Sequence, residues 1–290
     1  MVIYGKIAEI MNKPLIGFIG QGFIGKNYAD DFEARGYLVV RYALEEPFVQ
    51  NKEKIAKCDI VFIAVPTPTT PSGFDYSIVQ TALSLVGKGK VAVIKSTMIP
   101  GTTDILQKEN TDIFVLHSPE FLREVSAAYD AAHPDRNIVG IPIDGDKYRE
   151  KANSVISILP TAPFVKICTA RDAEFIKYGG NNFFYVKVVY MNLLYDLAQE
   201  IGCDWNTVQD GMVADPRIGA SHMNPVHDSG RGAGGHCFIK DFAAFANVYE
   251  KLVGDIDGVK ALRAFEEKNI KLLKDSRKDI DLLEGVYGKE

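Results

Sequence analysis

The sequence lacks the features that mark membrane, secreted and nucleic-acid-binding proteins. No apolar run approaches the roughly 20 residues that a transmembrane helix needs, and the first residues do not place a cleavable apolar stretch after a basic one. Lysine and arginine form no block of the kind that follows a phosphate backbone, and the formal net charge is −5. We therefore predict a cytoplasmic protein that binds neither nucleic acid nor a membrane.

Cysteine is scarce as well, with four residues in a chain of 290. The four show no CxxC spacing and are too few for a disulfide framework in a chain of this length. We expect Cys58, Cys168 and Cys203 to be small buried apolar side chains, which leaves Cys237 as the candidate for a reactive thiol. We expect no metal site.

The composition, 47% hydrophobic and 24% charged, is that of a globular protein large enough for a dinucleotide-binding domain and one smaller domain. In the first half, short Val/Ile-rich runs alternate with amphipathic segments, which is typical of parallel strands covered on both faces. We predict an α/β fold with an N-terminal Rossmann-like, doubly wound parallel sheet over residues 1–168. The runs are 15–20, 37–43, 59–66, 91–96, 112–118 and 137–143.

A smaller all-helical domain with a long connecting helix is predicted over residues 169–290. Apolar residues recur at helical spacing from about residue 172 to 202. A glycine-rich loop at 230–235 follows, then a helix over 238–252 and a charged amphipathic helix over 258–283. The periodic positions of the long helix are Phe175, Ile176, Phe183, Val186, Tyr190, Leu194 and Leu197.

Gly20, Gly22 and Gly25 form a GxGxxG pattern between the first apolar run and a helix that begins near Ile24. Glycines permit the tight turn and the close approach of backbone to a pyrophosphate, which then faces the helix N-terminus. The pattern alone is weak evidence, but here the strand before it and the helix after it supply the context that dinucleotide binding requires.

The acidic residue expected at the end of the second strand, which would bind the ribose hydroxyls, is missing. Ala43 occupies its position, and Glu45 or Glu46 is a possible substitute. We predict NAD rather than NADP, with Arg41 as the feature that argues for NADP.

Five segments stand out in order along the chain. They are FIAVPTP at 62–68 with GFDYSIV at 73–79, KSTMIPGTT at 95–103, SPEFLRE at 118–124 with PDRNIVG at 134–140, EFIKYGGNNFF at 174–184, and GGHCFIKD at 234–241. In this order the segments resemble the UDP-glucose/GDP-mannose dehydrogenase family. The resemblance implies a homodimer that oxidises the C6 alcohol of a nucleotide sugar, UDP-glucose first of all, to a carboxylate through an enzyme-bound thioester.

Cys237 is the predicted nucleophile. It follows GRGAGG and opens an apparent helix, where the positive end of the helix dipole and Lys240 favour the thiolate. A thiolate captures an aldehyde as a thiohemiacetal, which loses a hydride to give a thioester. The loop glycines suit the approach of a ligand better than they suit packing in a core.

Lys177 and Asn181 lie four residues apart on the long helix and hence on one face. The resemblance implies that they stabilise the oxyanion formed during alcohol oxidation; a solvated helix face is the plainer alternative. Gly179 and Gly180 lie between them, and each destabilises the helix by about 1 kcal/mol relative to alanine. Two such glycines favour the interpretation that a ligand approaches the helix backbone here.

The resemblance implies further roles. It makes Asp241 and Thr97 holders of the hydrolytic water, Glu120 the general base, and Glu124 a residue closer to the cofactor, although the choice between the two glutamates stays open. Predicted cofactor contacts besides the three loop glycines are Phe23, Ile24, Pro66, Thr67, Thr97, Glu124 and Lys240. Predicted substrate contacts are Glu120, Phe121, Leu122, Lys177, Asn181, Arg217 and Gly234, with Arg217 reaching the substrate or a neighbouring subunit.

The sequence departs from the family pattern in the cysteine loop, where GAGGHC replaces the usual GFGGSC, and in Ile239, where proline is common. Family members typically continue into a third, nucleotide-gripping domain, which this sequence is expected to lack. Two alternatives therefore stay open: a catalytically silent NAD-binding dimerisation subunit, and a two-electron dehydrogenase resembling the 3-hydroxyacid dehydrogenases.

Overall fold

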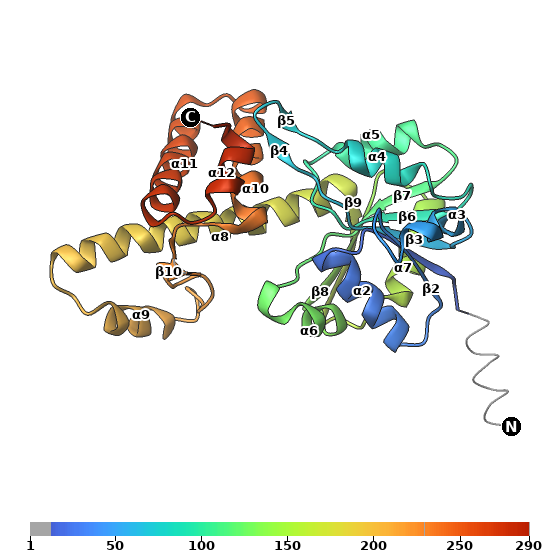
Figure 1. Cartoon of the computed structure of the whole chain (residues 1–290), viewed down its shortest axis with the longest axis horizontal. Helices are drawn as coiled ribbons and strands as arrows, with labels where there is room; N and C mark the ends of the chain where they lie inside the picture. The colour runs from blue at the N-terminus through green and yellow to red at the C-terminus, as the bar shows by residue number, and fades with distance from the viewer. Residues whose placement is uncertain (1–12, 229, 290) are drawn as a thin grey trace, which may run out of the picture. The chain divides into compact units, whose positions relative to one another are not determined.

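The computed structural model describes residues 13–228 and 230–289. Contacts divide the chain into two compact units, the first comprising the described residues of 13–67 and 75–177, the second those of 68–74 and 178–289 (Figure 1). The predicted domain boundary, between residues 168 and 169, lies inside the strand Phe164–Thr169, just before the long helix Ala170–Glu200. Within that helix the chain passes from the first unit to the second between residues 177 and 178.

A seven-stranded sheet forms the centre of the first unit, in the order β2-β1-β3-β6-β7-β8-β9. The strands from β2 to β7 pair in parallel, and β1, β3 and β6 are buried along their whole length, so the predicted Rossmann-like α/β fold is confirmed. Their bounds are β1 (Ile16–Ile19), β2 (Val39–Tyr42), β3 (Ile60–Ile63), β6 (Val91–Ile94), β7 (Phe114–His117), β8 (Arg136–Ile141) and β9 (Phe164–Thr169).

The last two strands differ from the prediction. The apolar run at 137–143 forms most of β8, which pairs antiparallel to β7 because the chain turns back after residues 118–135. The edge strand β9 pairs parallel to β8 and has no counterpart among the predicted runs. Its side chains are exposed or half-buried, so the sequence there lacks the continuous apolar pattern of a covered strand.

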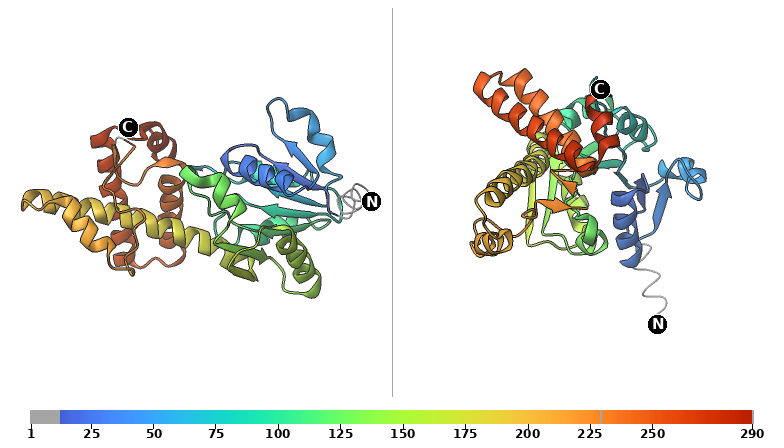
Figure 2. Two further views of the ribbon diagram at one scale, coloured as in Figure 1. Left: turned by 90° about the horizontal axis from the view of Figure 1, so that it is seen from below. Right: turned by 60° about the vertical axis from the view of Figure 1, so that its left-hand side comes forward.

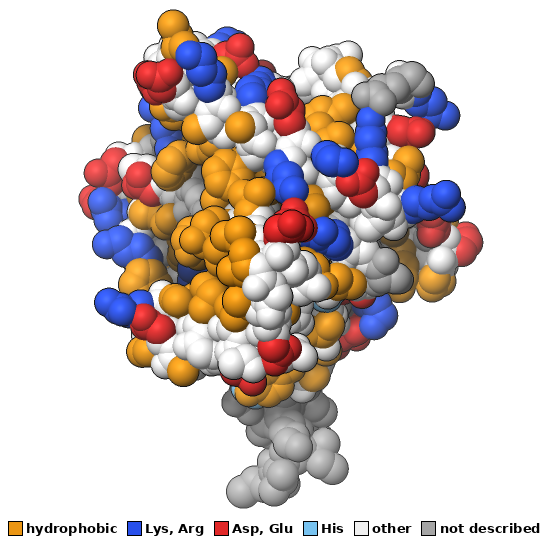
Figure 3. Space-filling view, turned by 90° about the vertical axis from the view of Figure 1, so that its left-hand side faces the viewer, with side chains coloured by type: hydrophobic (Ala, Val, Ile, Leu, Met, Phe, Trp, Pro, Cys, Tyr) orange, Lys and Arg blue, Asp and Glu red, His pale blue; other side chains and the backbone are white. Residues whose placement is uncertain are grey.

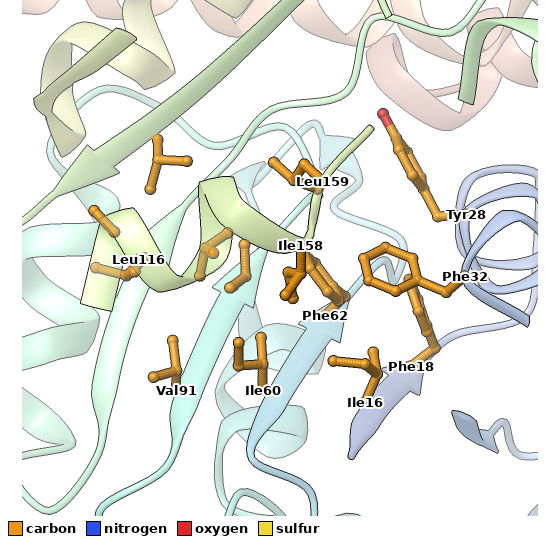
Figure 4. Packing of buried hydrophobic residues seen from close by; sticks show 14 of the residues in the cluster. Ile16, Phe18, Tyr28, Phe32, Ile60, Phe62, Val91, Leu116, Ile158 and Leu159 are labelled. Atoms are coloured by element: carbon orange, nitrogen blue, oxygen red, sulfur yellow. The ribbon is translucent and has the colours of Figure 1, made fainter. Parts of the chain in front are cut away.

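Helices cover both faces of the sheet, with α4 and α5 on one side and α2 and α7 on the other (Figure 1). The core under α2 is aromatic: Phe18 of β1, Phe62 of β3 and Phe32 of α2 have ring centroids 5.0–5.5 Å apart (Figure 4). The helical bounds are α2 (Phe23–Ala34), η1 (Val49–Asn51), α3 (Lys52–Ile55), α4 (Ser77–Leu83), α5 (Thr102–Glu109), η2 (Glu124–Ser126), α6 (Ala127–Ala132) and α7 (Asp146–Ile158).

The second unit is mainly helical. α10, α11 and α12 pack against one another (Figure 2), and Tyr185 of α8 stacks on Phe242 of α10 with ring centroids 3.9 Å apart. The bounds are α8 (Ala170–Glu200), α9 (Trp205–Val213), α10 (Gly235–Leu252), α11 (Ile256–Ser276) and α12 (Ile280–Tyr287), with two small hairpins, β10 (Val226–His227) with β11 (Gly230–Arg231), and β4 (Thr69–Thr70) with β5 (Gly73–Phe74).

Two features of this unit were not expected from the sequence. The charged segment at 258–283 is not one helix, because the turn at 277–279 separates α11 from α12 and both Arg277 and Asp279 adopt left-handed backbone conformations. The β4–β5 hairpin, although it follows β3 in the sequence, packs against α10 and α12. No helix in the described part of the chain is long and apolar enough to cross a bilayer.

Candidate functional site

The glycine loop between β1 and α2 has the shape that a dinucleotide phosphate requires. Gly20 has φ +91°, and a Cβ atom there would lie 2.1 Å from the Ala64 carbonyl oxygen; at Gly25 it would lie 1.9 Å from the Gly20 carbonyl oxygen. Gly22 is exposed, with no described protein atom within 4 Å of a Cβ position. The N-cap residue of α2 is Gly22, so no N-cap side chain binds the backbone N–H groups of the first turn of this helix. The loop therefore fits a pyrophosphate at the helix N-terminus.

Arg41, which argued for NADP, is engaged by carboxylates of α2. Its guanidinium lies 2.7 Å from both Asp30 and Glu33, and its side chain is only 12% exposed. Because two acids already surround this cation, it is not set up to bind a 2′-phosphate.

An open cleft of about 520 Å³ adjoins the N-terminus of α2. Phe23 and Asn27 of α2 line it together with residues 124–129. Of the predicted cofactor contacts, Phe23 and Glu124 therefore share one cleft, whereas Ile24 is half-buried against the core and Pro66 is exposed.

A buried ion pair lies in the first unit. Lys177 Nζ is 2.7 Å from Glu120 Oε1, and the two side chains are 7% and 5% exposed. The second oxygen of Glu120 accepts a hydrogen bond from the backbone N–H of Leu122 at 2.8 Å. The ring of Phe121 stacks under the Arg136 guanidinium, 3.7 Å away. A fixed carboxylate beside an ammonium group, away from water, is an arrangement suited to proton transfer.

Two buried basic residues near this pair were missed as site residues. Lys95 donates to the Ser118 hydroxyl at 3.1 Å and lies 4.4 Å from the centre of the Tyr28 ring; burial lowers its pKa to about 7, against the charge of Glu120. His117 is fully buried, and burial, with Lys95 and Lys177, lowers its pKa to about 3. Both residues lie in apolar runs of the sequence, and Lys95 is also part of the segment KSTMIPGTT. The signal that could have identified them is a basic residue inside a run that is expected to be buried.

The segment that carries Thr97 is fixed at both ends. Thr67 donates its hydroxyl proton to the carbonyl oxygen of Thr97 at 2.9 Å, which joins two predicted cofactor contacts. At the other end Glu174 accepts hydrogen bonds from the N–H groups of Gly101 and Thr103 and from the Thr103 hydroxyl, at 2.5–2.8 Å. Burial raises the pKa of Glu174 to about 7, although these donors oppose the shift.

In the second unit Asp241 is the centre of a polar network. Asn181 Nδ2 donates to Asp241 Oδ2 at 2.7 Å, and Lys240 Nζ donates to Asp241 Oδ1 at 2.6 Å, while the Asp241 side chain is 1% exposed. The charge of Lys240 is therefore shared with Asp241 and not directed at the thiol alone. Cys237 is exposed in the first turn of α10.

Two glycines of the cysteine loop, Gly232 and Gly234, are required for packing. A Cβ atom at Gly232 would lie 2.9 Å from Asn269 Oδ1, and one at Gly234 would lie 2.0 Å from Asp279 Oδ2. Protein atoms thus fill the space that the sequence suggested for a ligand. Gly179 and Gly180 of the long helix are not required for packing, because no described atom outside the helix lies within 4 Å of a Cβ position there.

The remaining predicted residues are placed as follows. Arg217 is exposed and forms an ion pair with Asp215 at 2.6 Å. Cys58 is buried as predicted, Cys168 is half-buried, and Cys203 is exposed, so the prediction for Cys203 was wrong. Among residues 13–228 and 230–289, no three His, Cys, Asp or Glu side chains are grouped to hold a metal ion.

Two family models match the chain. The NAD binding domain of the UDP-glucose/GDP-mannose dehydrogenase family matches residues 39–155, and the central domain of that family matches residues 171–269. The chain belongs to this family. Its cofactor is NAD, as the match to the family's NAD binding domain and the fit of the glycine loop agree.

Curated relatives and a solved structure of the family agree with this result. UDP-glucose 6-dehydrogenase of Rhizobium meliloti (strain 1021) is 35% identical over 207 residues, 67% of this chain and 46% of the relative. UDP-glucose 6-dehydrogenase YwqF of Bacillus subtilis (strain 168) is 32% identical over 258 residues, 83% of this chain and 56% of the relative. This chain thus spans about half the length of these family members. A UDP-glucose dehydrogenase from Pyrobaculum islandicum is similar in structure, with a TM-score of 0.75, 28% identity, and coverage of 88% of this chain and 68% of that one.

The glycine loop yields a matched pair of variants. Gly25→Ala forces a methyl group against the Gly20 carbonyl oxygen and should destabilise the fold by about 1–3 kcal/mol as well as abolish NAD binding. Gly22→Ala should leave the melting temperature nearly unchanged and weaken NAD binding, because its methyl group points into the open phosphate site. Thermal unfolding and calorimetric titration with NAD measure the two effects; equal melting temperatures for both variants would contradict the geometry.

The buried Lys95 predicts a pH-dependent stability. Its pKa is about 7 in the fold and 10.5 in the unfolded chain, so the unfolded chain binds more protons between these values and stability rises with pH across this window. Lys95→Met removes the group. The melting temperature of the variant relative to wild type should therefore be highest at or below pH 7 and fall by several degrees towards pH 10. Lys88→Met, at an exposed lysine, is the control; a difference that does not change with pH would rule the explanation out.

Proposed function

We propose that the protein oxidises the C6 primary alcohol of a nucleotide sugar to a carboxylate, with UDP-glucose as the first substrate to test and Cys237 as the nucleophile. One observation carries the proposal. A single helix, α8, holds both Lys177, ion-paired with Glu120, and Asn181, bonded to Asp241, and Asp241 follows Cys237 by four residues on α10. Family membership and the family relatives support the reaction class.

In the first oxidation the alcohol loses a proton and a hydride and becomes an aldehyde. The glycine loop would hold NAD, which would supply the hydride acceptor. The cationic Lys177 and the amide of Asn181 stabilise the negative charge that develops on the alcohol oxygen. Glu120, 2.7 Å from Lys177, receives the proton through that contact.

In the second oxidation the Cys237 thiolate adds to the aldehyde carbon and forms a thiohemiacetal. Loss of a second hydride, for which a second NAD bound at the glycine loop would be the acceptor, leaves a thioester. Attack by water then releases the carboxylate and restores the thiol. Asp241, held by two donors, and Thr97 orient this water. We assign the general base to Glu120, because Glu124 is exposed and lines the cleft beside α2.

The variant Cys237→Ser tests the covalent step. The wild-type chain should form two NADH per sugar acid, whereas the variant should lose acid formation by roughly 10³-fold or more, since a serine hydroxyl is a poor nucleophile without a dedicated base. NADH absorbance and acid production are counted on the same samples. Cys203→Ser, at an exposed cysteine in the same unit, should retain full turnover.

Other results would select the alternatives. One NADH per product, with an aldehyde or ketone formed and Cys237→Ser active, would indicate a two-electron dehydrogenase. NAD binding without turnover of any nucleotide sugar in a panel would indicate a catalytically silent subunit.

We further propose a homodimer formed through α8. Large apolar side chains are exposed along one stripe of the helix in the second unit, and hydrophobic side chains gather on the end of the molecule that carries α9 (Figure 3). A contiguous exposed apolar surface of this kind favours association, and a second copy of the same chain supplies a matching surface. The stripe comprises Phe183, Tyr190, Leu193 and Leu197, which are 43–63% exposed.

A charge placed in this stripe should separate the dimer. Leu197→Arg should sediment as a monomer at concentrations where wild type is dimeric, because an arginine in the interface would lose its hydration. Sedimentation equilibrium measures the mass. Val253→Arg, at an exposed apolar residue outside the stripe, should stay dimeric, and a monomeric wild type at micromolar concentration would refute the interface.

A further inference from the structure

The turn between α11 and α12 is built from residues in an unfavourable backbone conformation. Arg277 has φ 55° and Asp279 has φ 52°, and neither is glycine. Non-glycine residues in the left-handed region are strained, and they persist where surrounding contacts hold them. We therefore expect the side chains of this turn to make contacts that hold its conformation.

Three polar side chains at this turn, those of Ser276, Lys278 and Asp279, bind the backbone of the segment that leads to Cys237. The Ser276 hydroxyl, at the end of α11, accepts a hydrogen bond from the backbone N–H of Arg231 at 3.0 Å. Lys278 Nζ donates to the His227 carbonyl oxygen at 2.9 Å. Together with Asp279, these residues hold the backbone ahead of Cys237 at His227, Arg231 and Gly235.

Asp279 makes the contact nearest to the cysteine. Its Oδ2 accepts a hydrogen bond from the backbone N–H of Gly235, the first residue of α10, at 2.7 Å. The preceding N-cap position is Gly234, which has no side chain to cap the helix. A helix N-terminus normally obtains its acceptor from the N-cap side chain; here a carboxylate 44 residues away in the sequence provides it.

The fit between Asp279 and the loop is close. A Cβ atom at Gly234 would lie 2.0 Å from Asp279 Oδ2, so glycine is the residue that lets the carboxylate reach the helix end. Asn269 of α11 holds the preceding residue in the same way, since its amide accepts from the N–H of Ala233 at 2.7 Å and donates to the Ala233 carbonyl oxygen at 3.0 Å.

We propose that Asp279 is a positioning residue for Cys237: it fixes the first turn of α10 and places a negative charge at the helix end where the thiolate forms. The hydrogen bond to Gly235 locks the backbone two residues before the cysteine. The carboxylate also offsets the positive end of the α10 dipole, which would otherwise favour the thiolate more strongly. The catalytic meaning of this arrangement rests on the proposed role of Cys237 as nucleophile, but the positioning itself does not.

Two substitutions separate the bond from the charge. Asp279→Asn keeps an oxygen acceptor and removes the charge, so alkylation of Cys237 by iodoacetamide should become about 2–5-fold faster while amide exchange of residues 231–238 stays as in wild type. Asp279→Ala removes the acceptor too, so the same amides should exchange at least about tenfold faster, as expected when a cap worth about 1–2 kcal/mol is lost. Peptide mass spectrometry reads both quantities on the intact chain, without turnover.

Asp281→Asn is the matched control, because Asp281 is an exposed acid in the first turn of α12. It should change neither the alkylation rate nor amide exchange. Wild-type values for both Asp279 variants, or equal effects of Asp279→Asn and Asp281→Asn, would overturn the proposal. Failure of the proposed function looks different: Cys237→Ser would stay active while the Asp279 variants still altered exchange and alkylation.

In turnover assays the positioning role predicts a change in kcat without a change in the KM for NAD. Asp279→Ala should lower kcat about tenfold or more and leave the KM for NAD within about twofold, because the glycine loop for NAD lies in the first unit. A rise in the KM for NAD with unchanged kcat would contradict a role at the cysteine.

Discussion

The structure depends on the continuity of α8. This helix runs unbroken for 31 residues, and its rigid spacing puts Lys177 and Asn181 one turn apart on the same side. Lys177 is tied to Glu120 on the segment after β7, and Asn181 to Asp241 on α10. A break or a one-residue shift in α8 would rotate one of these side chains by about 100° relative to the other. The helix thus fixes the angle between the Lys177 and Asn181 side chains about its own axis.

The sheet and the helical unit were predictable because their signals are local. Continuous Val/Ile runs indicate covered strands, and GxGxxG between a strand and a helix marks the cofactor loop. The site residues were identified by resemblance, but their partners were not, because Glu120 and Lys177 are 57 residues apart and Asn181 and Asp241 are 60 apart. Such pairings depend on tertiary packing, for which sequence spacing carries no information.

Other features were hidden for different reasons. The burial of Lys95 and His117 contradicts the usual exposure of ionisable side chains. The turn at 277–279 contains no glycine or proline to mark it, since left-handed Arg277 and Asp279 take the place of the usual helix-ending glycine. At this turn the residue types do not favour the left-handed backbone, and contacts with the surrounding structure hold it.

The excursion of residues 68–74 into the helical unit has a consequence for how this protein is divided. The chain crosses between the two units at three places, after residues 67, 74 and 177, so no single cut yields both units intact. A fragment ending near residue 177 would expose a hairpin deprived of α10 and α12, and a fragment starting there would lack a piece of its own core. The two units are therefore not interchangeable modules: a recombination event that exchanges one of them has to exchange the hairpin with it.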